Sequence, residues 1–389
     1  MTATRPATPF FDEIVGLRIY LALWVAIGHG LQLSGFLNRS NPLLKIVLNG
    51  HAAVVIFMIV SGFVITNLLL SKQETYPRYI VRRFFRLFPA YLVCCIAGYF
   101  LADNWLAIVS NASWQDVAGW QRYAGSIAEL EAEARDNFWP HLGLHATMLH
   151  GLVPDEVLNR AAMTFLPAAW SISLEWQFYL VAPLVIAAIG AGRWKLAALV
   201  LVALALDVAY RREWLGAYDI GASLAGTTPY FAVGIASRLA FERLAALRVH
   251  PIPIAAVVLY ASMVLIEDAL PFAIWGVFYC YLLWHAHDPL LGPAFRLLTT
   301  SRPALMLGEA SYSLYLIHRP IQVLLGSVAM GAVALDRQSM LVVQMVAVVI
   351  ALPVSIAMYR MIERPGIAWG RKVAQRLPEH SAPVVPARA

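Results

Sequence analysis

The chain has 389 residues, of which 60% are hydrophobic and only 13% are charged, and its mean hydropathy is +0.66. Soluble domains contain about 25% charged residues, so this composition excludes an ordinary soluble enzyme and indicates an all-α, polytopic membrane protein. The net charge of +6 does not support nucleic-acid binding, because membrane proteins concentrate basic residues in their cytoplasmic loops.

The first apolar segment, residues 14–34, is long enough to cross a bilayer as a helix. It follows polar residues without a signal-peptide cleavage site, so residues 1–13 are predicted to be a cytoplasmic tail. The segment contains Arg18 and His29, and charged groups inside a membrane helix are costly and commonly functional. Their spacing is close to three helical turns, which puts them on one face and roughly 16 Å apart along the axis. His29 is therefore either a general base or a buried histidine bonded to a neighbour.

Ten further apolar segments follow, and the distribution of basic residues indicates which of them cross the membrane. The segment at 139–152 is short and contains three histidines, so it is predicted to be re-entrant or interfacial. With this segment excluded, the loops richest in arginine and lysine fall on one side, which predicts ten spanning helices with both termini cytoplasmic. The other segments lie at about 47–70, 87–103, 171–190, 194–210, 222–241, 252–267, 271–288, 305–330 and 340–360.

This topology predicts a multi-pass protein of the cell (inner) membrane whose helices surround a polar central passage. Residues 14–365 form the membrane domain, and residues 104–168 form an outer loop that is either a lid over an acceptor or a solvated connector. Residues 366–389 are predicted to be a cytoplasmic, largely disordered tail rich in proline and alanine. The three cysteines lie in apolar segments as predicted core residues, and no metal-ligand spacing occurs.

Three arginines, Arg82, Arg83 and Arg86, are predicted to lie at the cytoplasmic end of the third helix. Arg82 and Arg86 are four residues apart and should project from one side. Guanidinium groups suit phosphate oxygens because they form charged, bidentate hydrogen bonds. The alternative is that the cluster orients the helix and contacts lipid head groups.

Further polar residues interrupt the later apolar segments. Glu175 enters a helix near the predicted outer surface among aromatic residues, where a carboxylate could orient a histidine or an acceptor hydroxyl. Tyr312, Ser313 and His318 lie on one otherwise apolar helix, where the serine could also serve close helix packing. Glu363 precedes Arg364-Pro365 at the end of the last helix and could simply form a local ion pair.

Considered together, these motifs resemble the acyltransferase 3 family of integral membrane acyltransferases. The resemblance covers about residues 14–365 and includes Ser61, which stands in a serine-glycine-phenylalanine motif but has no nucleophile-elbow pattern around it. The matching pieces are Arg18 with His29, FMIVSGFVI (57–65), RRFFRLFPAY (82–91), WSISLEWQFYL (170–180), SYSLYLIH (311–318) and ERP (363–365).

The resemblance implies acyl-CoA as donor, a catalytic His29, an essential Arg18 and an arginine cluster near the CoA. From it we expect transfer of an acyl group, with acetyl expected first, to a hydroxyl of an envelope or exported glycan or lipid-linked sugar. Acyl-CoA, with acetyl-CoA as the first expectation, is then a co-substrate, and no permanently bound cofactor or metal is expected. Either Glu175 or His318 would orient His29, and an acyl-histidine intermediate is the alternative to general-base catalysis. The competing functions are a transporter or flippase and an acyltransferase of small-molecule glycosides.

Overall fold

The computed structural model describes residues 11–38, 40–72, 74–265 and 269–378. Within these ranges the chain is helical and contains no β-strand. The helices are α1 (Asp12–Leu33), α2 (Pro42–Val47), α3 (Gly50–Ser71), α4 (Tyr76–Phe100), α5 (Ala102–Asn111), α6 (Trp120–Asp136), α7 (Phe138–Ala146), α8 (Trp170–Gly190), α9 (Arg193–Arg211), α10 (Leu224–Ala245), α11 (Pro251–Leu265), α12 (Leu270–Trp284), α13 (Leu291–Thr300), α14 (Arg302–Glu309), α15 (Ser311–Ala332), α16 (Arg337–Met358) and α17 (Arg364–Gln375). Short 3-10 turns are η1 (His150–Leu152), η2 (Pro167–Ala169) and η3 (His285–His287), and η4 (Tyr359–Glu363) is π-helical.

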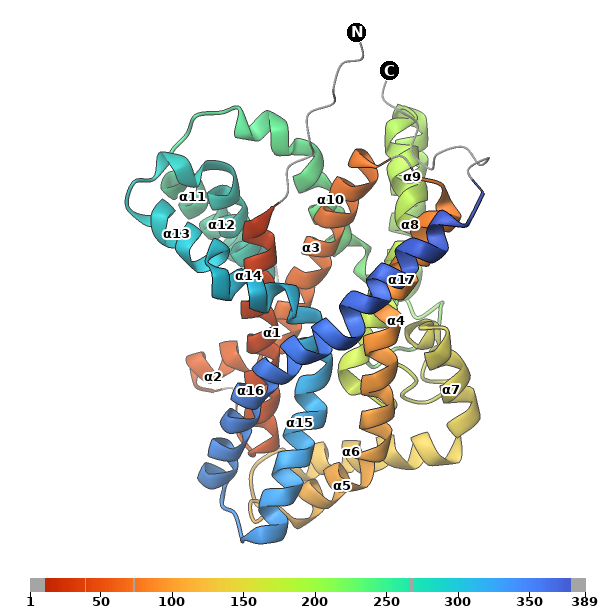
Figure 1. Ribbon diagram of the computed structural model, residues 1–389, viewed down its shortest axis with the longest axis vertical. Helices are drawn as coiled ribbons and strands as arrows, with labels where there is room; N and C mark the ends of the chain where they lie inside the picture. The colour runs from red at the N-terminus through yellow and green to blue at the C-terminus, as the bar shows by residue number, and fades with distance from the viewer. Residues whose placement is uncertain (1–10, 39, 73, 266–268, 379–389) are drawn as a thin grey trace.

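Helices α1 and α3 form the centre of the bundle (Figure 1). Helix α1 contacts α3, α15 and α16, and α3 packs along α10. Glycines permit this close approach, since a Cβ atom at Gly234 would lie 1.9 Å from the carbonyl oxygen of Ile59 and one at Gly62 would lie 2.4 Å from that of Phe231. Small residues are typical of helix contacts in membranes because van der Waals packing and backbone proximity drive association there.

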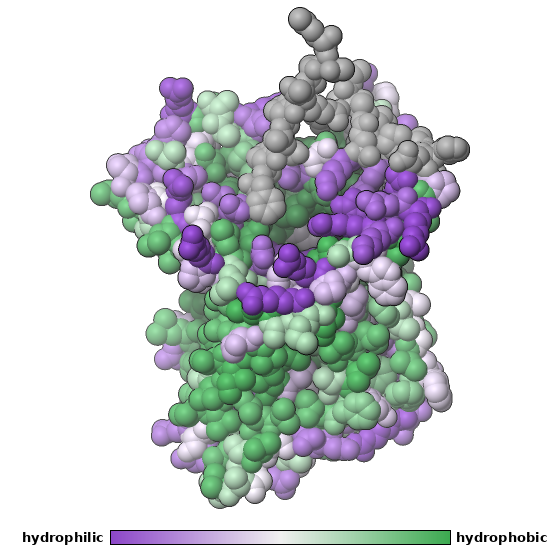
Figure 2. Space-filling model, in the orientation of Figure 1, coloured by the Kyte–Doolittle hydropathy of each residue, from purple (hydrophilic) through white to green (hydrophobic). Residues whose placement is uncertain are grey.

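The predicted helical class is confirmed, whereas the predicted number of membrane spans is not. Among the described residues, four helical stretches are long and apolar enough to cross a membrane, and the bent pair α4–α5, with a 49° bend, counts as a fifth. The predicted span at 305–330 is divided at Ala310 into α14 and α15, and α11 and α12 have only 15 residues each. A hydrophobic surface nevertheless covers the middle of the face in Figure 2, with hydrophilic residues gathered toward both ends.

The segment at 104–168 packs against the bundle through part of its length. Helices α5 and α6 lie across one end of the molecule (Figure 1), and their buried aromatic residues Trp105 and Trp120 pack with Leu33 and Val323 of α1 and α15. Burial of large aromatic side chains supplies a core of its own to this segment. The 139–152 region contains only the short elements α7 and η1.

Residues 366–375, which were predicted to belong to a largely disordered tail, are helical. Residues 366–375 belong to α17, which continues the direction of α16 and η4 as one long helix in Figure 1. Helix α17 is strongly amphipathic, and it packs closely on α4, where a Cβ atom at Gly370 would lie 2.5 Å from the Cβ atom of Phe85. Residues 1–10 of the predicted N-terminal tail and 379–389 of the C-terminal tail lie outside the described residues.

Candidate active site

A cavity of about 130 Å³ lies between α1, α3, α4, α8, α10 and α15. We call it the central cavity. It brings together polar residues from five of the predicted motifs, which are far apart in the sequence. These residues are Arg18, Ser61, Arg83, Arg86, Glu175 and Tyr312, with Ser171, Tyr179, Ser311 and Tyr315 beside them.

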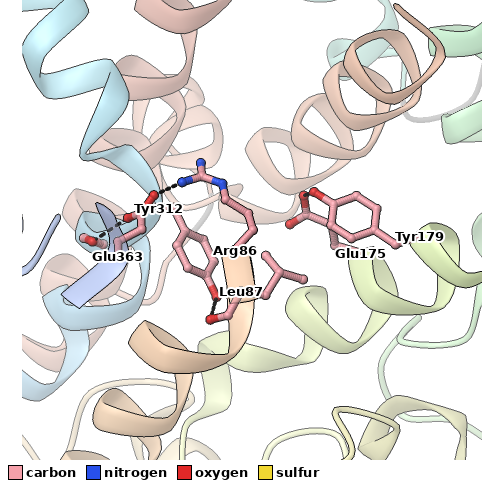
Figure 3. A network of polar contacts seen from close by, with 7 residues as sticks. Arg86, Leu87, Glu175, Tyr179, Tyr312 and Glu363 are labelled. Carbon is pink, nitrogen blue, oxygen red and sulfur yellow. Dashed lines mark hydrogen bonds and ion pairs between the residues drawn. The ribbon is translucent and has the colours of Figure 1, made fainter. Parts of the chain in front are cut away.

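Arg86 is held in place by residues of the two C-terminal motifs, SYSLYLIH (311–318) and ERP (363–365) (Figure 3). It forms an ion pair with Glu363, whose side chain is 0% exposed, and Ser313 Oγ donates a 2.7 Å hydrogen bond to the other carboxylate oxygen. Tyr312 lies under the guanidinium and donates a 2.8 Å hydrogen bond to the carbonyl of Leu87. A buried charge is tolerated when it is paired and hydrogen-bonded. Glu363, Ser313 and Tyr312 therefore fix Arg86 in place.

The π-helical turn η4 carries Glu363 to this position. Pro365 lacks an N–H group, and its ring would clash with the carbonyl four residues earlier in a regular α-helix. The wider π turn directly before it avoids that clash and is a feature often found at functional sites. The glutamate-arginine-proline motif thus has a structural effect in addition to its charge.

Several polar groups of the central cavity lack an ion-pair or hydrogen-bond partner among the described residues, although the guanidinium of Arg83 lies over the rings of Tyr79 and Tyr179. Arg18 and Arg83 form no ion pair there, and the buried Arg83 Nε and the hydroxyls of Ser61 and Ser311 make no hydrogen bond. Glu175 instead accepts a hydrogen bond from the hydroxyl of Tyr179 (Figure 3). Buried donors without an acceptor are costly, and Arg18 and Arg83 carry positive charge without an ion pair among the described residues, so the central cavity is suited to a polar or anionic group.

The three predicted arginines do not form one cluster. Arg83 and Arg86 line the central cavity, whereas Arg82 lines a separate surface groove and forms a 2.6 Å ion pair with Glu74. Helical spacing alone places Arg82 near Arg86. The prediction was wrong because an arginine side chain is long enough for its charged end to follow its ion-pair partner rather than its helical position.

The side chains of His29 and His318 form a hydrogen-bonded pair, which we call the histidine pair. His29 Nδ1 lies 2.9 Å from His318 Nε2, and the rings stack with 5.2 Å between their centroids. His318 Nδ1 lies 3.3 Å from the carbonyl oxygen of Leu314, which can only accept. A neutral His318 therefore carries its proton on Nδ1 and accepts from His29 Nδ1–H, which leaves His29 Nε2 with its lone pair.

The histidine pair lies next to the central cavity but does not line it. Tyr315 lies between them, since it lines the cavity and its ring centroid is 6.1 Å from that of His318. Its hydroxyl donates a 2.9 Å hydrogen bond to the carbonyl of Ala168. The central cavity therefore ends short of the histidine pair, and the predicted continuous passage is not confirmed. Of the two candidates for orienting His29, His318 contacts it and Glu175 lies on the cavity wall instead.

A family model described as an acyltransferase domain matches residues 11–360. This chain belongs to the acyltransferase 3 family. No curated protein and no solved structure matched the chain in the other two comparisons. The protein is therefore a membrane acyltransferase, and the matched range includes the histidine pair and the whole lining of the central cavity.

Sequence reasoning missed one charged residue of this acyltransferase. Arg319 is 5% exposed, lies with its guanidinium carbon 4.2 Å from the ring centroid of Trp105, and donates hydrogen bonds to the hydroxyl of Tyr123 at 2.6 Å and to the carbonyl of His29 at 3.4 Å. It thereby ties α6 to the helices that carry the histidine pair. The signal was present, because an arginine inside an apolar helix is as unusual as the histidine that precedes it.

Glu131 of α6 predicts a pH dependence of the acyltransferase's stability. Its side chain is 8% exposed beside Arg319, and burial raises its pKa to about 7. The folded protein then holds a proton that the unfolded chain, with an ordinary carboxyl pKa near 4.5, releases as pH rises. Stability should therefore fall between about pH 4.5 and 7 through this group, and Glu131→Gln should remove that fall.

Thermal unfolding of the detergent-purified protein at pH 5 and pH 8 tests this prediction. Glu131→Gln should melt at a higher temperature than wild type at pH 8 and near the wild-type temperature at pH 5. Glu129→Gln, on the exposed side of the same helix, is the matched control. An equal difference between Glu131→Gln and wild type at both pH values would contradict the assignment.

Proposed function

We propose that this membrane acyltransferase moves an acyl group from acyl-CoA to a hydroxyl of a cell-envelope or exported glycan. Acetyl is the acyl group that we expect. The observation that carries the proposal is the hydrogen bond between His29 and His318, beside a cavity in which Arg18 and Arg83 form no ion pair among the described residues. The histidine pair is suited to activating a hydroxyl. The arginines of the cavity are suited to holding the polar arm and phosphates of a thioester donor.

On the donor side, the proposal assigns Arg83, Arg86 and Arg18 to polar and anionic groups of acyl-CoA. Arg86 is already neutralised by Glu363, so its part is to position the donor rather than to supply net charge. Arg83 and Arg18 supply the positive charge. The hydroxyls of Ser61 and Ser311 offer further hydrogen bonds within the cavity. We keep the predicted orientation, with the donor entering from the cytoplasmic side.

On the acceptor side, the proposal assigns His29 Nε2 as the general base. Nε2 takes the proton of the acceptor hydroxyl while the oxygen attacks the thioester carbonyl carbon. The carbon–sulfur bond then breaks, and the proton passes to the departing CoA thiolate. His318 stabilises the imidazolium form by accepting the Nδ1–H bond, as an orienting group does in other base-assisted acyl transfers.

The proposal requires Tyr315 to move. Its ring separates the central cavity from the histidine pair, so the thioester reaches His29 only when the tyrosine side chain turns aside. The hydrogen bonds that hold it are to the Ala168 carbonyl and the Ser171 hydroxyl, at 2.9 and 2.8 Å. Ala168 lies in the tight 3-10 turn η2, and Ser171 lies in the first turn of α8, which follows it directly.

Purified protein incubated with labelled acetyl-CoA and an extract of envelope glycans tests the function. The expected result is acceptor-dependent release of free CoA thiol together with a labelled glycan whose mass rises by one acetyl group. Other acyl-CoA donors and small glycosides in parallel reactions identify the preferred donor and acceptor. Absence of thiol release with every donor and acceptor would overturn the proposal.

His318 should act as a positioning residue. Losing a hydrogen bond to a charged group costs about 1.5–3 kcal/mol, so His318→Ala should lower kcat by roughly 10- to 150-fold while KM for acetyl-CoA stays near the wild-type value. His318→Gln retains a carbonyl acceptor for His29 Nδ1–H and should recover part of the loss. A purely structural role would instead predict equal losses for both variants, in step with reduced melting temperatures.

A further inference from the structure

A second cavity, of about 20 Å³, lies between α6, the bend that joins α4 to α5, the turn η2 and α15. We call it the α6 cavity. Its polar lining comes from Trp105, Glu131 and Arg319, and the rest of its lining is apolar. A cavity needs about 10–15 Å³ to hold one water molecule. The α6 cavity is therefore matched in size to a single hydroxyl group.

Two buried groups of the α6 cavity lack a hydrogen-bond partner among the described residues. Trp105 is 6% exposed, and its indole Nε1–H has no acceptor. Glu131, which is likewise buried, forms neither a hydrogen bond nor an ion pair there. The indole N–H can only donate, whereas a carboxyl group accepts in both of its protonation states. Buried polar groups without partners are costly, and one hydroxyl in the cavity would satisfy both because it accepts and donates.

Arg319 connects the α6 cavity with the histidine pair. Its guanidinium lies over the ring of Trp105 and donates to the hydroxyl of Tyr123 and to the carbonyl of His29. Tyr315 and Arg319 are four residues apart on α15, so they share one face and lie about 6 Å apart along the axis. Tyr315 lines the central cavity and Arg319 lines the α6 cavity. The α6 cavity therefore lies one helical turn beyond Tyr315 and beside His29.

The segment from η2 into α8 places the two cavities in the same order. Leu166 and Pro167 line the α6 cavity, the next residue, Ala168, accepts the hydrogen bond of Tyr315, and Ser171 lines the central cavity. Both this segment and α15 thus pass from one cavity to the other at Tyr315. A donor in the central cavity and a group held in the α6 cavity would therefore meet at this tyrosine and the histidine pair.

We propose that the α6 cavity binds a second hydroxyl of a sugar acceptor, distinct from the hydroxyl that is acylated, and so selects polyhydroxylated acceptors over simple alcohols. This inference rests on the proposed acyl transfer to a glycan. The bound hydroxyl accepts from Trp105 Nε1–H and donates to the carboxylate of Glu131. Arg319 holds this anchor at a fixed distance from the base, since it contacts both the Trp105 ring and the His29 backbone. An acceptor without this hydroxyl leaves both buried groups unpaired and is disfavoured for that reason.

Methyl glycosides of glucose, galactose and mannose, each compared with its monodeoxy derivatives, test the inference with acetyl-CoA as donor. One derivative that still carries the reacting hydroxyl should have an acceptor KM about 5- to 150-fold higher than its parent. The KM for acetyl-CoA should stay unchanged. Trp105→Phe removes the N–H and keeps an aromatic ring under Arg319, and Glu131→Leu removes the carboxyl. Each variant should raise the KM of the parent glycoside and reduce its difference from that derivative.

Trp114→Phe is the matched control, because Trp114 is buried in the same apolar cluster and its Nε1–H also lacks an acceptor, but it does not line the α6 cavity. It should leave the acceptor KM unchanged. Equal KM values for each parent glycoside and all its reacting derivatives in wild type would overturn the inference, as expected of a cavity that holds only water. Equal effects of Trp105→Phe and Trp114→Phe would also overturn it.

Saturation-transfer-difference NMR separates failure of this inference from failure of the proposed function, because it detects weak glycoside binding to the detergent-purified protein without turnover. A signal that falls when one hydroxyl is removed, and falls again in Trp105→Phe but not in Trp114→Phe, supports a sugar site even if no acyl group is transferred. A signal of equal strength in wild type and Trp105→Phe overturns the site. Absence of a signal from all three parent glycosides in wild type overturns it as well.

Discussion

Replacing His29 with alanine should lower the kcat of acyl transfer by about 10²- to 10⁴-fold, which is the usual contribution of a general base. The reason is that Nε2 of His29 carries the lone pair of the histidine pair, since Nδ1 donates to His318. The fold should persist, because the side chain is half-buried and the tight packing of α1 is made by its small and aliphatic residues. The measurement is kcat with saturating acetyl-CoA, accompanied by the melting temperature.

His287→Ala is the matched control, because His287 is exposed and lies in the turn η3, outside the site. It should leave kcat unchanged. An acyl-histidine mechanism also requires His29, and rapid-quench analysis for acetylated protein separates it from general-base catalysis. Turnover by His29→Ala at the wild-type rate would exclude both mechanisms.

Replacing Glu363 with alanine should destabilise the protein by about 3–5 kcal/mol, the range observed when one partner of a buried ion pair is removed. Glu363 is fully buried, and its loss leaves the guanidinium of Arg86 and the hydroxyl of Ser313 without their acceptor. The released Arg86 should also raise KM for acetyl-CoA. Denaturant unfolding in detergent measures the first effect, and steady-state kinetics measure the second.

The double variant Arg86→Ala/Glu363→Ala removes both charges and should be less destabilised than the sum of the single variants. Asp103→Ala is the matched control for an exposed pair, since Asp103 and Arg135 are 82% and 53% exposed. Its expected effect is about 0–1 kcal/mol. Similar losses for Glu363→Ala and Asp103→Ala would contradict the assignment of a buried, structurally important pair.

The helical class could be predicted from the sequence because apolar segments of bilayer length have few other solutions. The division of 305–330 at Ala310 could not, because α14 turns away to pack its Gly308 against the backbone of α1, a tertiary contact. The packing of α5 and α6 could not be predicted from the sequence either. Their aromatic residues look like an interfacial loop in sequence and are buried only because Leu33 and Val323 meet them.

The candidate site was recognisable residue by residue, since polar groups inside apolar helices stand out. How these residues pair was not recognisable. Glu175 and His318 were equal candidates to orient His29, and only the three-dimensional packing of α1 on α15 selects His318. Arg82 was grouped with Arg86 by helical spacing, which carries no information about Glu74 eight residues earlier.

The hydrogen bond from the Tyr315 hydroxyl to the Ala168 carbonyl bears on how much acyl donor would be lost to hydrolysis. In the proposed mechanism, the ring of Tyr315 would keep a thioester in the central cavity away from His29 and from water activated by its imidazole. Such a partition would suppress hydrolysis of the thioester before an acceptor binds. Shortening this side chain would accordingly favour loss of acyl groups to solvent over their delivery to sugar.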